Sequence, residues 1–131
     1  MDLDDALARI DRARRKAAEI GVPMAIAVVD PGGHVVAVAR MEGAAFVATD
    51  IAAGKAYTAA AVKIPTAMLQ DGVNSHPAFA AAVANLTHGR FVAAAGGAPL
   101  FADGTLVGAI GVSGGMTAEQ DSAVLEAGLG S

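Results

Sequence analysis

The chain has 131 residues, no cysteine and a formal net charge of -4, with 9 basic residues against 13 acidic ones. The missing cysteines exclude disulfides, thiolate metal sites and cysteine nucleophiles, and the acidic balance disfavours nucleic acid as a partner. No apolar run approaches the roughly 18 residues of a membrane helix, and the acidic start Asp2-Leu3-Asp4-Asp5 is unlike a secretory signal. We therefore expect a cytoplasmic protein with one domain over residues 1–131 and no membrane partner.

The first predicted elements are a helix and a β-hairpin. Apolar residues recur at spacings of three and four along Asp2–Ile20, which predicts an amphipathic helix that ends at Gly21. Two valine-rich runs, Pro23–Val29 and Val35–Met41, follow on either side of Asp30-Pro31-Gly32-Gly33. A Pro-Gly pair is typical of a type II turn, so we predict an antiparallel hairpin whose strands are both covered on both faces.

The middle of the chain is predicted to be helical. The long helix, Phe46–Val62, is rich in alanine and contains a single basic residue, Lys55. A lone lysine on an apolar helix usually extends along the surface to water, which we expect of Lys55; a cation inside a pocket is the alternative. Shorter helices are predicted at Pro65–Gln70 and from Asn74 to Leu86. Because alanine buries little area, further burial between subunits of a homo-oligomer is expected.

The C-terminal part of the chain is predicted to form three strands and a helix. The strands are Arg90–Ala95, Pro99–Ala102 and Gly104–Gly115, and Thr117 with Gln120 forms a capping box for the last helix. Hairpins dominate and no strand-helix-strand unit repeats. The order of elements therefore predicts an α+β fold, a five-stranded antiparallel sheet flanked by helices.

Three glycines, Gly108, Gly111 and Gly114, lie in or at the end of the last predicted strand. Glycine weakens a strand, so it makes sense where another backbone, a side chain or a ligand comes close. We expect close packing of a helix on the sheet at these positions, and the floor of a ligand site is the alternative.

Several familiar sites are disfavoured. No phosphate-binding loop occurs, and Gly108–Gly114 lacks the glycine spacing of a dinucleotide fingerprint. Ser113 has no histidine after it in the chain, unlike the serine of a nucleophile elbow. The three histidines, His34, His76 and His88, form no metal motif, so we expect structural roles for them. His76 is the first candidate ligand, because it lies in the least regular part of the chain.

One group of polar residues near strand and helix ends suggests a small-molecule site. Its members are Arg40, Glu42, Asp50, Lys55 and the backbone amides of Gly96 and Gly97. Cations, a carboxylate and free amides can bind a small carboxylate, or polarise a carbonyl while an acid or base moves a proton. In that hypothesis Lys55, Glu42 and Arg40 are catalytic, and Gly96, Gly97, Asp50 and His76 bind the ligand. A structural ion-pair network is the alternative.

Five motifs in order resemble the GlcG/HbpS family of small haem-binding or haem-degrading-type domains, which also occur as the C-terminal domain of some cobalamin adenosyltransferases. The motifs are Val28–Ala37, Arg40–Ala44, Lys55–Ala59, Gly96–Pro99 and Gly104–Gly114. The resemblance implies a profilin-like fold, assembly into dimers up to octamers, and haem as a possible cofactor. It assigns no residue as a haem ligand, and the metal ligand remains unknown.

Three functions are compatible with these observations. The first is an oligomeric haem- or tetrapyrrole-binding protein linked to haem degradation or redox sensing, as the resemblance implies. The second is a cofactor-independent enzyme that acts on a small carboxylate or carbonyl compound through Lys55, Arg40 and Glu42. The third is a non-catalytic assembly module whose alanine-rich helices make subunit contacts.

Overall fold

The computed structural model describes residues 1–130, and Ser131 lies outside the described residues. Its sheet has four antiparallel strands in the order β2-β1-β4-β3. The helices are α1 (Leu3–Ile20), α2 (Val47–Val62), the 3₁₀ helix η1 (Thr66–Leu69), α3 (Gln70–Asn74), α4 (Pro77–Leu86) and α5 (Ala118–Leu129). The strands are β1 (Ala25–Val29), β2 (Val35–Arg40), β3 (Gly97–Ala102) and β4 (Thr105–Ser113).

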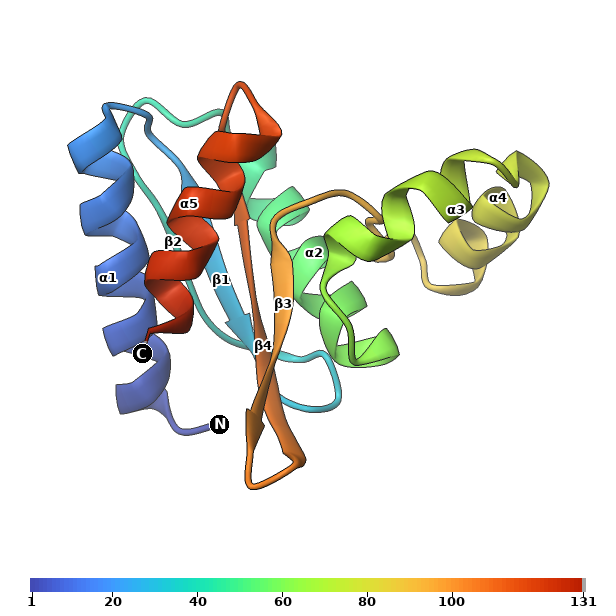
Figure 1. The fold of residues 1–131 in the computed structure, drawn as a ribbon, viewed down its shortest axis with the longest axis horizontal. Helices are drawn as coiled ribbons and strands as arrows, with labels where there is room; N and C mark the ends of the chain where they lie inside the picture. Colours follow the sequence, from blue (N-terminus) through green and yellow to red (C-terminus); the bar gives the residue numbers. More distant parts are fainter. Residues whose placement is uncertain (131) are drawn as a thin grey trace.

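The sheet lies between two layers of helices (Figure 1). Side chains alternate along β1, so Ile26 and Val28 join the core beneath α1 and α5, while Ala25 and Ala27 pack against α2. Strand β1 is buried throughout, as predicted. The same prediction is wrong for β2, which has a strand on one side only and exposes half of its residues.

Close packing of α2 on β4 confirms the expectation for Gly111. A Cβ atom at Gly111 would collide with the carbonyl oxygen of Ala52 and would lie 2.6 Å from the amide nitrogen of Ala56. Alanine and glycine on the two elements therefore let the helix backbone approach the strand backbone directly.

The predicted α+β class is confirmed, but the prediction of five strands is wrong. Residues 90–95 cross the outer side of α2 and do not join the sheet. The backbone N–H of Val92 donates to Thr58 Oγ1 at 2.8 Å, and the Val92 side chain occupies the space left by the absent Cβ of Gly54. This segment thus packs on a helix instead of pairing with a strand.

The hairpin between β1 and β2 forms, although its turn is not of type II. A type II turn requires a positive φ at Gly32, and the residue with positive φ is Gly33, at 84°. The carboxylate of Asp30 accepts hydrogen bonds from the backbone N–H groups of Gly32 (2.9 Å) and His34 (3.0 Å). These bonds, His34 foremost, lower the pKa of Asp30 and fix the turn.

A helical arm of η1, α3 and α4 projects from the sheet (Figure 1). Helix α4 packs only against α3, and none of its residues is buried. Its sequence is nevertheless apolar, and Phe79 and Leu86 are 66% and 80% exposed. Within residues 1–130, no helix combines the length and the apolar character needed to cross a membrane.

Candidate functional site

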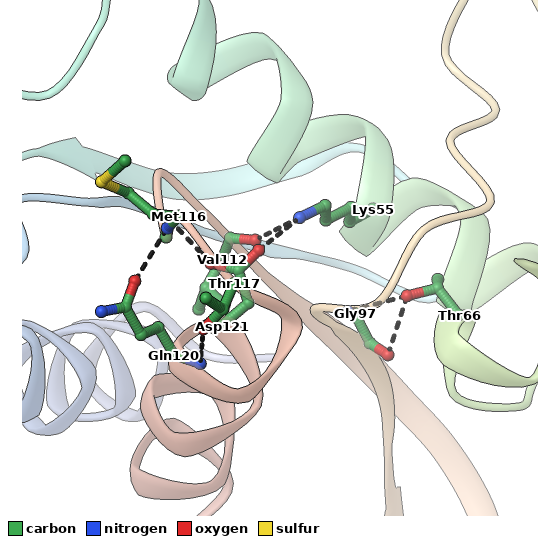
Figure 2. A network of polar contacts seen from close by, with 9 residues as sticks. Lys55, Thr66, Gly97, Val112, Met116, Thr117, Gln120 and Asp121 are labelled. Carbon is green, nitrogen blue, oxygen red and sulfur yellow. Dashed lines mark hydrogen bonds and ion pairs between the residues drawn. The ribbon is translucent and has the colours of Figure 1, made fainter.

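Lys55 is buried, so the expectation that it reaches water is wrong. Its side chain leaves α2 and its Nζ atom donates to the carbonyl oxygen of Val112 (3.0 Å) and to Asp121 Oδ2 (3.2 Å), as Figure 2 shows. Asp121 lies in the first turn of α5, and its other oxygen accepts from the N–H of Gly115 at 2.9 Å. The residue Lys55 is only 4% exposed.

This ion pair joins α2, the end of β4 and the start of α5. Both charges are hydrogen-bonded inside the chain, which is how a buried pair offsets the cost of its desolvation. The sequence pattern does not single out Asp121, because an acidic residue in a first helical turn is favoured by the helix dipole alone. Nothing local links it to a lysine 66 positions away.

The Gly96-Gly97 turn is packed against the same lysine. A Cβ at Gly96 would lie 2.9 Å from Lys55 Nζ, and one at Gly97 would lie 2.6 Å from the Lys55 carbonyl oxygen. The N–H of Gly97 donates to Thr66 Oγ1 at 2.8 Å (Figure 2). That amide is therefore occupied and is not open to a ligand.

In residues 1–130 the other side chains of the predicted site form no hydrogen bond or ion pair with Lys55. Arg40 and Glu42 are exposed at and beyond the end of β2, and within residues 1–130 neither forms an ion pair with Lys55. His76 is exposed at the start of α4, where its Nδ1 lies 2.9 Å from the carbonyl oxygen of Gly72. Asp50, on the first turn of α2, lines a separate groove.

This second location, which we call the α2 groove, is an open hollow of about 290 Å³. It lies between α2, the β1–β2 hairpin and the loop that follows α4. The lining residues are Gly33 and Val35 of the hairpin, Asp50, Ala53, Gly54 and Tyr57 of α2, and His88, Gly89 and Arg90 of the loop.

Small residues and one aromatic ring shape the α2 groove. Ala53 and Gly54 have small or absent side chains, which leaves space in the groove above α2. The absent Cβ of Gly54 also lets the carbonyl oxygen of Arg90 lie against the helix. The ring of Tyr57 packs against Gly33, where a Cβ would come within 2.6 Å of it. The Arg90 guanidinium carbon lies 4.8 Å from the centre of that ring, a cation–π contact.

The local sequence pattern does not bring His88, Arg90 and Tyr57 together in a site. His88 follows a predicted helix end, where a histidine is explained by the helix dipole alone. Its backbone φ of 56° is the unusual feature, and it appears only in the structure. The tertiary approach of residues 88–90 to α2 had no signal in the local sequence pattern.

A larger hollow of about 720 Å³ lies between α1 and the end of α5 and is lined by Arg9 and Arg12. Both arginines are used to cap the last turn of α5. Arg9 Nη1 donates to the carbonyl oxygen of Leu129 at 2.6 Å, and Arg12 Nε donates to that of Ala127 at 3.4 Å. This hollow is therefore explained by the packing of two helices, and the α2 groove is the better candidate site.

Comparison with known proteins connects the chain to one family. The model of the family described as "Haem degrading protein HbpS-like" matches residues 1–130. A 15.0 kDa uncharacterized protein from the dhaT-dhaS intergenic region of Citrobacter freundii is 40% identical over 115 residues, which are 87% of this chain and 79% of that protein.

Two further relatives carry functional names. The corrinoid adenosyltransferase PduO of Salmonella typhimurium strain LT2 is 37% identical over 83% of this chain, which spans only 32% of that larger protein. A crystal structure of a PduOC:heme complex superposes with a TM-score of 0.85 at 32% identity and covers 98% of this chain and 92% of the other.

Proposed function

Since the chain belongs to the family described as "Haem degrading protein HbpS-like", we propose that it binds haem or a related tetrapyrrole in the α2 groove. Family membership supports the ligand class, and the relative crystallised with heme supports it further. The observation that supports this location is that His88 and Arg90 line the α2 groove together with the small residues Ala53 and Gly54.

The chemistry of haem fits the residues that line the α2 groove. Haem is a flat apolar macrocycle with a central iron that takes a nitrogen, sulfur or oxygen ligand, and it carries two carboxylates. Val35 and Ala53 offer an apolar surface, His88 offers an imidazole, and Arg90 offers a cation for a carboxylate. When bound, haem would supply a redox-active iron, while these residues would hold and orient it.

The size of the α2 groove supports a homo-oligomer. Its 290 Å³ is at the small end of the range of about 300–1,000 Å³ for ligand pockets. One chain would thus cover only part of the macrocycle. We propose that a second copy covers the remainder, in an assembly between a dimer and an octamer, and that the apolar arm contributes to the subunit contacts.

More detailed roles remain proposals of the same kind. Haem degradation, redox sensing and a profilin-like fold are proposed from the family resemblance, and a cytoplasmic location is a separate proposal. A non-catalytic assembly module is the second candidate function, because α4 presents an apolar and charge-free surface. The enzyme hypothesis based on Lys55, Arg40 and Glu42 stays a proposal; Lys55 is buried and bonded to Asp121, whereas Arg40 and Glu42 are exposed.

Titration of the purified protein with hemin, followed through the Soret band, tests the proposal. We expect a saturable shift, and we expect Ala53→Trp to weaken binding tenfold or more, about 1.4 kcal/mol, because the new ring fills the floor of the groove. Ser122→Trp on the exposed side of α5 is the matched control and should bind like the wild type. A wild type with no saturable shift, or an Ala53→Trp variant with full affinity, would overturn the proposal.

A further inference from the structure

We infer that His88 is an axial iron ligand of the bound haem and that Arg90 pairs with one of its carboxylates. The inference rests on the proposed function and adds the residues that hold the ligand. His88 lines the α2 groove, whereas His34 and His76 do not. The Nδ1 of His34 lies 3.2 Å from Asp30 Oδ1, and that of His76 lies 2.9 Å from the Gly72 carbonyl oxygen.

The backbone of His88 supports a role for its side chain. Helix α4 is followed by two successive left-handed residues, His88 at φ 56° and Gly89 at φ 78°. Glycine adopts this conformation without the steric cost that a side chain brings. Residues held in such conformations cluster at ligand sites, where surrounding contacts maintain them. Lys63 and Asp103 also have positive φ, but neither lines the α2 groove.

The position of His88 is held by contacts on both sides of it. Its N–H donates to the carbonyl oxygen of Asn85 at 3.2 Å, and the N–H of Gly89 donates to that of Ala84 at 2.7 Å. Four residues further along, Val92 is bonded to Thr58 of α2. The imidazole is therefore presented by an anchored loop, as a metal ligand requires.

Arg90 fixes the orientation of the haem in the α2 groove. Its Nε donates to the carbonyl oxygen of Thr87 at 2.9 Å, and its guanidinium carbon lies over the Tyr57 ring. The terminal N–H groups can then bind a carboxylate. Asp50, the acidic residue of the groove, would repel a carboxylate. The haem carboxylates are thus expected at the Arg90 end and away from Asp50.

His88→Gly separates ligation from folding, because glycine favours the backbone conformation of this position. We expect the hemin complex of His88→Gly to lose the wild-type Soret and visible bands, and added imidazole to restore them. Its thermal unfolding midpoint should not fall. His34→Ala and His76→Ala are the matched controls and should keep the wild-type spectrum.

The outcomes separate the two proposals. A wild type that does not bind hemin would overturn the proposed function. A wild type that binds hemin while His88→Gly keeps its spectrum would overturn the assignment of His88 alone. Loss of the wild-type spectrum in His34→Ala or His76→Ala would also contradict it.

Arg90 is tested with a pair of ligands. We expect Arg90→Met to weaken hemin binding roughly tenfold or more, since a charge-assisted hydrogen bond is lost. Hemin dimethyl ester, in which both carboxylates are blocked, should bind Arg90→Met and the wild type equally. An equal loss of affinity for both ligands would show that Arg90 shapes the groove only and would contradict the carboxylate contact.

Discussion

Single residues hold the centre of this molecule together, and the Lys55–Asp121 pair is the strongest case. Removing one partner of a buried ion pair leaves the other charge in a low-dielectric environment, which is costly. The pair also fixes three elements at one point, since Lys55 contacts Val112 as well as Asp121. We therefore assign it a structural role.

Lys55→Met should lower the free energy of unfolding by about 3 kcal/mol, because Asp121 would stay buried without its cation. The double variant Lys55→Met, Asp121→Leu should recover part of this loss, since no isolated charge remains. Urea unfolding followed by circular dichroism measures both values. A Lys55→Met variant as stable as the wild type would contradict the structural role. So would a double variant whose loss of unfolding free energy exceeds the summed losses of Lys55→Met and Asp121→Leu measured singly.

At the residue scale, sequence patterns predict the element on which a residue lies better than they predict its contacts with distant residues. Lys55 was expected on the long helix, which is correct, but its burial depends on Asp121 of another helix. The Asp30 turn was predicted as a turn, and only the structure shows which glycine takes the positive φ. Local spacing contains no information on contacts between distant segments, so the α2 groove was not predicted.

Among the secondary-structure elements, the contact of α2 with β4 depends most on small side chains. Gly111→Ala should lower the free energy of unfolding by about 2–3 kcal/mol or more, because its Cβ would collide with the backbone of α2. Gly72→Ala in α3 is the matched control, since a Cβ there meets nothing within 4 Å. That change should be neutral or slightly stabilising. Chemical denaturation of both variants checks this, and equal effects would refute the close-packing explanation.

The elements were largely predictable where hydrophobic periodicity or turn chemistry is strong. Helix α1, the hairpin and α2 lie close to their predicted ranges, and α5 begins directly after its predicted cap Thr117. Residues 90–95 were predicted as a short strand that precedes the Gly96-Gly97 turn. They pack on α2 instead, because Thr58 and Gly54 provide a hydrogen bond and a space that no local pattern reveals.

At the scale of the whole molecule, the arm is the feature that one chain does not explain. A short apolar helix with no buried residue gains little stability alone. We expect light scattering of the purified protein to give the mass of at least two chains, each of 12.9 kDa. The double change Phe79→Ser, Leu86→Ser should lower that mass, whereas Phe101→Ser on β3 should not. A wild-type mass of one chain would contradict the proposed assembly.

The fold class of the whole molecule was predictable from the order of its elements, since hairpins predict antiparallel pairing. The number of strands was not, because one extended segment was counted as a strand. The resemblance to the GlcG/HbpS family was identified from five motifs and is confirmed by the family match over residues 1–130. The roles of the residues in those motifs were harder to predict from the sequence. Lys55, Gly96 and Gly97 were predicted as site residues, but they pack against one another inside the fold.

The central claim is that haem occupies the α2 groove. The most direct measurement is the position of iron in crystals of the hemin complex, located by anomalous scattering at the iron absorption edge. We predict one iron peak per chain in the groove, at bonding distance from His88 and with electron density for the macrocycle over Ala53. An iron peak at another place, such as beside His76 on the arm, would contradict the claim.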